Sequence, residues 1–280
     1  MTSAPDYHDS TPPGEAKDTA RPSPQNIYDN PRFFEGYRTL REKDTGLNGA
    51  LEIPAIRALL PDLHGRAVLD LGCGFGDFAR YAREQGAATV TALDVSLKMI
   101  EAARALTHDA AITYVHGSIE DRAVQPAAFD LVVSSLALHY IADYATVVRR
   151  VFDSLRPGGL LVFSVEHPVC TANPTGWIHD ADGHRLHWPL DHYQQQGARS
   201  TSWFVDGVIK YHRTMETYVN TVLDAGFQLR HLAEPQPTAE RLRERPDLED
   251  TVRRPPMLIL VAMKPDAAHA PQRRNHETKD

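Results

Sequence analysis

The chain has 280 residues, 42% of them hydrophobic, and a formal net charge of −7. This length allows one substantial core with an insertion or cap. The acidic balance argues against nucleic acid as a partner, because such a surface needs a basic patch. Two cysteines, Cys73 and Cys170, are too few for a disulfide framework. The N-terminus lacks a signal-peptide pattern, and the longest apolar run, Met257 to Met263, is too short to span a bilayer. We therefore expect a cytoplasmic protein without membrane contact.

Both ends of the chain are polar. Residues 1–24 are rich in Pro, Asp, Thr and Ser, and the stretch after Lys264 has little apolar content. Such a composition cannot bury enough apolar surface to order the chain. We expect disordered tails at 1–24 and 265–280 around a single domain at 25–264.

The first part of that domain, residues 25–60, begins with a helical pattern. Tyr28, Phe33 and Tyr37 have the spacing of one face of an amphipathic helix. The pattern predicts a helix that packs this aromatic face against the rest of the domain.

Residues 61–165 alternate between strand and helix patterns. Short apolar runs, typical of parallel strands buried on both faces, occupy Ala67–Leu71, Thr89–Leu93, Ile112–His116, Phe129–Ser134 and Leu160–Val165. Helical spacing covers Phe75–Gln85, a segment capped by Ser96 that runs to about Leu106, and Tyr144–Leu155. This repetition predicts a doubly wound α/β sheet.

The pattern breaks after Val165. Residues 166–213 form an aromatic-rich and His-rich insertion without clear periodicity. Helical spacing resumes from Tyr211 to Ala225, and Phe227–Ala233 and Met257–Met263 have the pattern of strands. An antiparallel pair at one edge, within residues 214–264, would complete a seven-stranded sheet.

A glycine-rich turn follows the first expected strand. Asp70 is followed by Gly72, Gly74 and Gly76, and glycine lets the backbone turn sharply and approach a ligand closely. The dinucleotide fingerprint G-x-G-x-x-G needs a third glycine where this chain has Asp77, and an acid at a helix start opposes a pyrophosphate. S-adenosylmethionine (SAM) has no phosphate, and a carboxylate such as Asp70 suits its ammonium group. The spacing therefore favours SAM over NAD.

A second acidic residue, Asp94, ends the second expected strand. An acid at this point can accept hydrogen bonds from both ribose hydroxyls of a nucleotide. Alone, Asp94 could equally cap the following helix. The sequence of strand, glycine turn, helix, strand and acid makes a ribose contact the more specific interpretation.

Three segments carry a family resemblance. Asp70–Gly76 with Asp94 resembles the SAM motif of class I methyltransferases, and Ser134–Tyr140 and Leu155–Phe163 resemble later motifs of that family. The resemblance implies a Rossmann-like fold with N-terminal lid helices over the cofactor. It also implies SAM contacts from Tyr28, Asp70, Gly72, Cys73, Gly74, Asp94, Val95, Met99 (or Leu97), Ser118, Ile119, Ser134 and Leu136. Ser118 stands where many relatives have Asp, so we expect the Ile119 backbone to contact adenine.

The candidate base is Glu166, directly after the fifth strand, where ligands bind in parallel sheets. A structural carboxylate that caps a helix or pairs with an arginine is the alternative. His167, His139 and Tyr28 are further catalytic candidates, and each histidine could instead be structural. Methyl transfer needs alignment, exclusion of water and a proton acceptor, but no metal.

The insertion supplies candidate substrate contacts, since aromatic side chains can wall a flat acceptor. With residues outside it, the set is Tyr37, His139, Glu166, Trp177, Trp188, Trp203 and Tyr211. Some of the aromatic residues could equally form a small core of the insertion. Four insertion histidines suggest zinc, but their spacing fits no common site. They are His179, His184, His187 and His192.

Only a resemblance to a smaller subgroup of the family narrows the choice of methyl acceptor. Ser164–Pro168 and Lys210–Arg213 are similar to a subgroup of small bacterial methyltransferases. That subgroup includes actinomycete natural-product enzymes that methylate indole C3 or a prenyl diphosphate. We expect C-methylation of an indole-type small molecule by a monomer or homodimer. A Mg²⁺-dependent prenyl diphosphate reaction, sensitive to Arg213 or the insertion histidines, and a non-catalytic SAM-binding protein remain alternatives, and an oxygen or nitrogen nucleophile also fits the fold.

Overall fold

The computed structural model describes residues 25–43, 46–121, 125–173 and 175–266. The predicted tails at 1–24 and 265–280 fall outside these residues, apart from Pro265 and Asp266. Among the described helices, none is long and apolar enough to cross a membrane.

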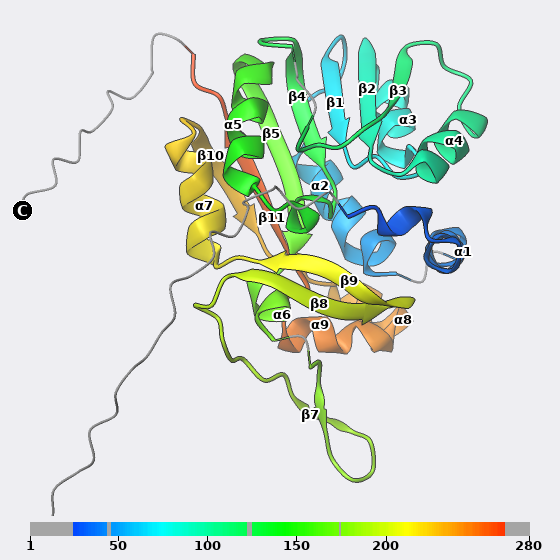
Figure 1. Cartoon of the computed structure of the whole chain (residues 1–280), viewed down its shortest axis with the longest axis vertical. Coiled ribbons are helices and arrows are strands. Elements are labelled where there is room, and N and C mark those ends of the chain that lie inside the picture. Colours follow the sequence, from blue (N-terminus) through cyan, green and yellow to red (C-terminus); the bar gives the residue numbers. More distant parts are fainter. Residues whose placement is uncertain (1–24, 44–45, 122–124, 174, 267–280) are drawn as a thin grey trace, which may run out of the picture.

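A seven-stranded sheet forms the centre of the molecule, in the order β10-β11-β5-β4-β1-β2-β3. The five parallel strands are β1 (Ala67–Leu71), β2 (Thr89–Asp94), β3 (Ile112–His116), β4 (Phe129–Ser134) and β5 (Leu155–Glu166). β11 (Met257–Met263) is antiparallel to β5 and to the edge strand β10 (Gln228–Ala233). The predicted edge pair and the seven-stranded sheet are thus confirmed (Figure 1).

Helices cover both faces of the sheet. Successive strand residues alternate between two buried clusters, so that Val132 faces one side and Val133 the other. One cluster includes side chains of α5 (Tyr144–Ser154) and α7 (Met215–Asp224), and the other packs beneath α2 (Ile53–Leu59), α3 (Asp77–Glu84) and α4 (Leu97–Ala105). The fold is therefore doubly wound, as the sequence predicts.

The N-terminal part, the insertion and the segment before β11 lie mostly at one end of the sheet. The N-terminal part contains a 3₁₀ turn η1 (Ile27–Asp29), α1 (Pro31–Glu42) and a π-helical turn η2 (Asn48–Glu52). The insertion contains α6 (Pro168–Ala172) and two hairpins, β6 (Ile178–His179) with β7 (Arg185–His187) and β8 (Gly197–Trp203) with β9 (Val205–His212). A 3₁₀ turn η3 (Leu138–Tyr140) follows β4, and α8 (Ala239–Glu244), η4 (Pro246–Leu248) and α9 (Glu249–Arg253) precede β11.

Two predicted boundaries are wrong. Tyr211 and His212 belong to β9 rather than to the following helix, which begins at Met215 after Thr214 caps it by accepting from the Thr217 N–H. β5 begins at Leu155, five residues before the predicted start, because Leu155 already pairs with Phe129 of β4, and after an irregularity the pairing with β4 resumes at Leu160. Both errors arise where pairing with another strand, absent from any local pattern, decides the backbone.

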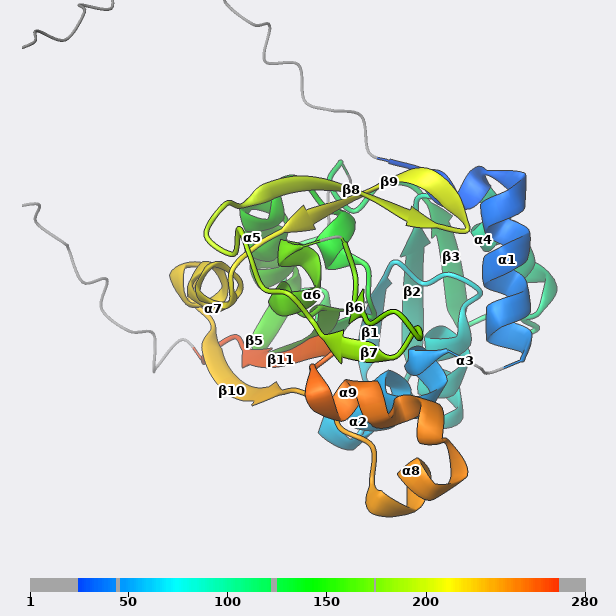
Figure 2. The same cartoon turned by 90° about the horizontal axis from the view of Figure 1, so that it is seen from below.

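The end of the sheet at which the parallel strands finish is covered by the insertion and the N-terminal part. In Figure 2, which looks onto this end, β8 and β9 arch across it and their turn lies beside α1. The aromatic rings of Phe33 and Trp203 meet there at 5.3 Å between centroids. The insertion and the N-terminal part therefore meet over the loops that follow β1 to β5.

Candidate active site

A cavity of about 490 Å³ lies at this covered end of the sheet. Its walls come from loops after all five parallel strands, from the N-terminal part, and from β8 and β9. Ligands in doubly wound sheets bind at this end of the strands. The position and size of the cavity fit a cofactor together with a small second molecule.

The glycine turn after β1 is shaped for close contact with a ligand. Gly72 and Gly74 have positive φ values of 80° and 52°, a region that glycine adopts without steric cost. The N–H groups of Gly72 and Cys73 both donate to the Leu93 carbonyl oxygen, at 2.8 and 3.0 Å, which ties the turn to β2. No atom lies within 4 Å of the place where a Cβ of Gly74 would be, so this side of the turn is open to the cavity.

Asp94 closes the next side of the cavity. One carboxylate oxygen accepts from the Gly74 N–H at 2.8 Å, and the other accepts from the Ser96 N–H at 2.9 Å. Burial raises the pKa of Asp94, and the two N–H donors oppose that shift. Each oxygen retains a lone pair, so Asp94 can still accept hydrogen bonds from a diol.

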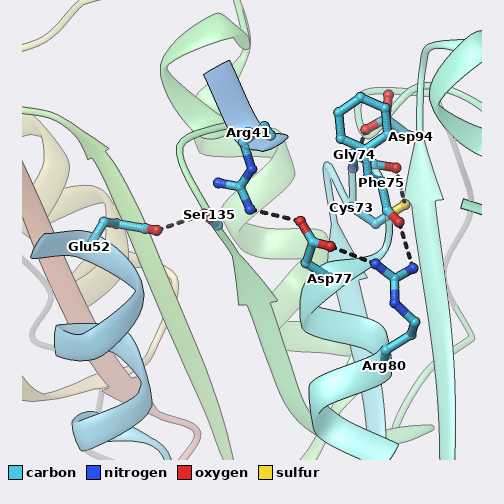
Figure 3. Close-up of polar contacts among 9 residues, drawn as sticks. All are labelled: Arg41, Glu52, Cys73, Gly74, Phe75, Asp77, Arg80, Asp94 and Ser135. Atoms are coloured by element: carbon cyan, nitrogen blue, oxygen red, sulfur yellow. Dashed lines mark hydrogen bonds and ion pairs between the residues drawn. The ribbon is translucent and has the colours of Figure 1, made fainter. Parts of the chain in front are cut away.

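A side chamber of about 80 Å³ continues behind the glycine turn. Asp70 and Glu52, both fully or nearly fully buried, line it, and each has one carboxylate oxygen without a hydrogen-bond partner. Burial, with a smaller contribution from nearby Asp94, raises the pKa of Asp70 to about 8. Burial also raises the pKa of Glu52, although the Ser135 hydroxyl (Figure 3) and the Ser164 hydroxyl each donate to it at 2.6 Å. Each unpartnered oxygen could accept a hydrogen bond from a cationic ligand.

Arg41 of α1 borders the same chamber. Its guanidinium donates to Asp77 at 2.8 Å, and Asp77 also accepts from Arg80 at 2.5 Å (Figure 3). The sequence reasoning used Asp77 only as an argument against a pyrophosphate. Its position at the start of α3 also joins the N-terminal part to the glycine turn.

Glu166 lines the main cavity from the end of β5. Its carboxylate forms an ion pair with Lys210 of β9 at 2.5 Å, and Lys210 is itself buried. Burial alone would raise the pKa of Glu166, but the charge and hydrogen bond of Lys210 outweigh it and hold the pKa below its usual value. Burial lowers the pKa of His139 to about 4, so its imidazole is neutral at neutral pH. Glu166 is therefore a charged carboxylate facing a largely enclosed space.

Aromatic rings roof the cavity. Tyr28 packs edge-on against Tyr37 at 5.2 Å and Tyr140 at 6.2 Å, and Tyr37 packs edge-on against Trp203 at 5.9 Å. All four side chains line the cavity. The aromatic face predicted for the N-terminal part thus points inward, although Tyr28 precedes α1 instead of belonging to it.

Most residues predicted for the site come together at the main cavity. They are Tyr28, Tyr37, Gly72, Gly74, Asp94, Val95, Met99, Ser118, Ile119, Leu136, His139, Glu166, Trp188 and Trp203. Asp70 and Cys73 lie at the side chamber instead. Leu97, the alternative to Met99, is 43% exposed and does not line the cavity, whereas Met99 is 1% exposed and does.

Other predicted residues lie away from both spaces. Ser134 is buried and donates to the Leu71 carbonyl oxygen at 2.9 Å. His167 caps α6 by accepting from the Val169 N–H at Nδ1, and its Nε2 donates to the Glu234 carboxylate at 2.8 Å. Trp177 and Tyr211 do not line the cavity. Arg213 donates to the carbonyl oxygens of Ile141 and Ala142, which is a structural role for a buried guanidinium.

The insertion histidines do not gather at the cavity. His179, His184 and His187 lie exposed on the β6–β7 hairpin, and His192 is exposed on the loop before β8. His184 hydrogen-bonds to Asp180 within one turn at 3.3 Å. In the described residues, the group with metal-like spacing is Asp180, Asp182 and His184, on this exposed turn.

Several residues that line the two spaces have no signal in the sequence, and Glu52, Lys210 and Arg254 are examples. Glu52 lies in a segment without a motif, and Arg254 lies in an Arg-Pro-rich loop. Lys210 belongs to the Lys210–Arg213 segment noted above, but nothing local indicates that its ammonium meets Glu166. Each is brought to the cavity by a contact between segments far apart in the sequence.

Comparisons with known proteins agree with this geometry. Residues 69–163 match the family model described as a methyltransferase domain. A solved S-adenosylmethionine-dependent methyltransferase of Mesorhizobium loti is 45% identical, with a TM-score of 0.73, and the match covers 78% of this chain and all of that one. A Haemophilus influenzae protein described only as uncharacterized is 35% identical over 85% of this chain and 97% of its own length. A malonyl-acyl-carrier-protein O-methyltransferase of Enterobacter lignolyticus is 42% identical over 110 residues, 39% of this chain and 43% of that protein.

Three observations indicate the same family. They are the match that covers all of a solved enzyme, the matching family model, and the glycine turn with its two acids. The chain belongs to the class I SAM-dependent methyltransferases, enzymes that use SAM as the methyl donor.

Proposed function

We propose that this methyltransferase methylates a ring carbon of an electron-rich, indole-type small molecule, with Glu166 accepting the proton that the ring loses. The observation that carries the proposal is the charged Glu166 carboxylate, held by Lys210 in a cavity roofed by aromatic rings. The relatives described as malonyl-acyl-carrier-protein O-methyltransferases match less than half of this chain, so they do not indicate its acceptor.

The cofactor contacts follow from the two spaces around the glycine turn. Asp94 would accept from the ribose hydroxyls, and Met99 and Ile119 would contact the adenine. Asp70 and Glu52, each with an unpartnered oxygen, would hold the ammonium group, and Arg41 would face the methionine carboxylate. When bound, SAM supplies a methyl group on a sulfonium, which is an activated donor that needs no metal.

The acceptor would lie between the loop after β4 and the aromatic roof. Leu136 in that loop has a φ of 48°, and its N–H donates to the Ser164 hydroxyl at 2.9 Å. An unusual backbone held by a buried hydrogen bond is typical of a preorganised site. Together with Tyr28, Tyr140 and Trp203, this loop would hold a flat ring in line with the methyl group and exclude water.

The low pKa of Glu166 favours a carbon nucleophile. The methyl–sulfur bond breaks as the ring carbon forms its bond to the methyl group, which leaves a cationic ring whose charge a nearby carboxylate stabilises. In an indole that carries a substituent on the methylated carbon, the proton lost is that of the ring nitrogen, and Glu166 would take it. A phenol has a pKa of about 10, so a carboxylate with a lowered pKa would be a poor base for an oxygen nucleophile. His139, neutral beside Glu166, would position the carboxylate by accepting from the Glu166 N–H at 3.3 Å.

The alternatives have less support. A diphosphate needs several cations, yet among described cavity residues the lysines and arginines are Lys210 and Arg254, and Lys210 is paired with Glu166. Neither Arg213 nor the insertion histidines line the cavity, although the prenyl diphosphate hypothesis assigned the headgroup to them. A non-catalytic SAM-binding role is not supported by relatives that are methyltransferases.

The test is replacement of Glu166 by Gln, with deuterated-methyl SAM and a panel of 3-substituted indoles, and with product measured by mass spectrometry. We expect unchanged affinity for S-adenosylhomocysteine and turnover reduced about a hundredfold or more. Glu234→Gln, which changes a carboxylate outside the cavity, serves as the control. Absence of any methylated indole from the unmodified enzyme, or full turnover in the Glu166→Gln variant, would refute the proposal.

A further inference from the structure

Arg254 reaches the same cavity from an unexpected part of the chain. It lies between α9 and β11, and β11 begins at Met257, which pairs with Glu166 of β5. Its side chain lines the cavity together with Cys170 and Trp188. An arginine is therefore present at the acceptor end of the site, beyond Glu166.

The guanidinium of Arg254 has unused donors. Its Nε is buried and has no hydrogen-bond partner, and its Nη1 contacts only the Sγ of Cys170. In the described part of the chain it forms no ion pair, whereas neighbouring Arg253 pairs with Asp250 at 3.6 Å. A buried N–H of a charged group without a partner is costly, and an acceptor atom from a ligand would remove that cost.

The guanidinium is also held in a fixed orientation. It stacks over the ring of Trp188 at 4.0 Å, and the Trp188 indole N–H donates to the Val169 carbonyl oxygen at 2.9 Å. Stacking occupies the face of a guanidinium and leaves the N–H groups on its rim. A fixed, planar fork of donors matches the geometry of a carboxylate.

The charges at this end of the cavity leave one positive charge unbalanced. Lys210 is neutralised by Glu166 at 2.5 Å, and Arg254 has no such partner in the described residues. The other carboxylates of the main cavity, Asp94 and Glu120, belong to the loops after β2 and β3. One excess charge suits a singly charged group.

The order of the strands places Arg254 at a distance from the loop after β4. That loop would face the acceptor ring, and β11, which follows Arg254, lies two strands away, beyond β5. Neighbouring strands lie about 4.8 Å apart, so the backbones of these two segments are about 10 Å apart. The Arg254 side chain extends into the cavity from its side and covers much of this distance, so a carboxylate on a short side chain of the ring would be within its reach.

We propose that the acceptor carries a carboxylate on a short side chain and that Arg254 binds this group. The inference rests on the proposed function for the position of the ring, and it adds a specificity-determining residue and a substrate class. Arg254 would orient the acceptor from the end opposite the cofactor.

The test is calorimetric binding to the full chain loaded with S-adenosylhomocysteine. The probes are two matched pairs, indole-3-acetate with indole-3-acetamide and cyclohexylacetate with cyclohexylacetamide. We expect each carboxylate to bind about tenfold more tightly than its amide, because the amide lacks the negative charge and the second acceptor oxygen that a guanidinium would pair with. Arg254→Gln should abolish the preference and leave affinity for S-adenosylhomocysteine unchanged. Arg253→Gln, the adjacent arginine outside the cavity, should keep it.

The proposal is overturned if neither pair shows a preference for the carboxylate, or if the preference survives in the Arg254→Gln variant. The two pairs of probes distinguish failure of this inference from failure of the proposed function. If cyclohexylacetate binds more tightly than its amide and the indole ring adds no affinity, the anion site is supported and the aromatic acceptor is rejected. If indoles are methylated but the carboxylates bind no more tightly than the amides, the proposed function is supported and the anion site is rejected.

Discussion

At the scale of single residues, the site is built from carboxylates that the fold buries without completing their hydrogen bonds. Asp70 and Glu52 each keep one unpartnered oxygen at the side chamber, whereas Lys210 neutralises Glu166 and two backbone N–H groups donate to Asp94. An ionised buried carboxylate without a partner destabilises the folded state. In this protein that cost is concentrated where a cationic ligand would remove it.

Replacement of Asp70 by Asn should stabilise the cofactor-free protein. The carboxyl has a usual pKa of 3.8 and a folded pKa of about 8, so the folded state binds the extra proton between these values. The free energy of unfolding therefore falls as pH rises from about 4 to about 8, by a few kcal/mol in all, and the Asn variant escapes this loss. Thermal melts should show a higher Tm for Asp70→Asn at pH 8 and a shrinking difference towards pH 4. Affinity for SAM should be weaker.

Asp130→Asn is the matched control, and we expect it to change the stability of the protein in the opposite direction. Burial alone would raise the pKa of Asp130, but the Ala67 N–H and Arg156 outweigh it and lower the pKa. Its contribution to stability is present at neutral pH and lost as pH falls through the folded pKa, so Asp130→Asn should destabilise at pH 7. A lower Tm for Asp70→Asn at pH 8 would contradict our account of the side chamber.

At the scale of elements, the roof depends on one contact between α1 and the β8–β9 hairpin. Gly36 lies on α1, and a Cβ there would lie 2.6 Å from the Phe204 ring. Phe204 itself has a φ of 57°, at the turn that brings Trp203 and Phe204 onto Phe33. The N-terminal part and the insertion thus form one cover, although about 170 residues separate them.

Gly36→Ala should loosen this cover. In an isolated helix the change favours folding by about 1 kcal/mol, because glycine is the poorer helix former. The clash with Phe204 should reverse the sign and cost about 1–3 kcal/mol. Hydrogen exchange should quicken in β8 and β9, and Glu35→Ala, at an exposed neighbour on α1, should leave it unchanged. A rise in stability with no change in exchange would show that the contact is unimportant.

At the scale of the whole molecule, the sheet provides a rigid edge and three sequence-distant segments enclose it. The N-terminal part, the β8–β9 hairpin and the segment before β11 each add cavity residues: Tyr37, Trp203 and Arg254 are examples. The edge loops carry most of the proposed cofactor contacts and the cover carries most of the proposed acceptor contacts. A ligand that touches both should therefore order the cover against the sheet.

Binding of S-adenosylhomocysteine should stabilise the protein and protect the cover. At a ligand concentration of 100 times Kd, mass action adds about 2.7 kcal/mol to the free energy of unfolding. Hydrogen exchange should slow in η1 and α1, where Tyr28 and Tyr37 line the cavity, and stay unchanged in the exposed β6–β7 hairpin. Equal protection by NADH would contradict the choice of cofactor.

The sequence by itself determined the sheet, the glycine turn and the class of cofactor. Parallel strands buried on both faces are continuous apolar runs, and the glycines and acids that follow them are local signals, so β1 to β4 and Asp94 were identified from neighbouring residues alone. The insertion gave no such signal, because β8 reads Gly-Ala-Arg-Ser-Thr-Ser-Trp and is mostly polar. Only the tertiary structure joined Lys210 to Glu166, turned Arg254 into the cavity and removed His167 and Trp177 from it. Those outcomes depend on pairing and packing between distant segments, and no local pattern records which distant partner a side chain will meet.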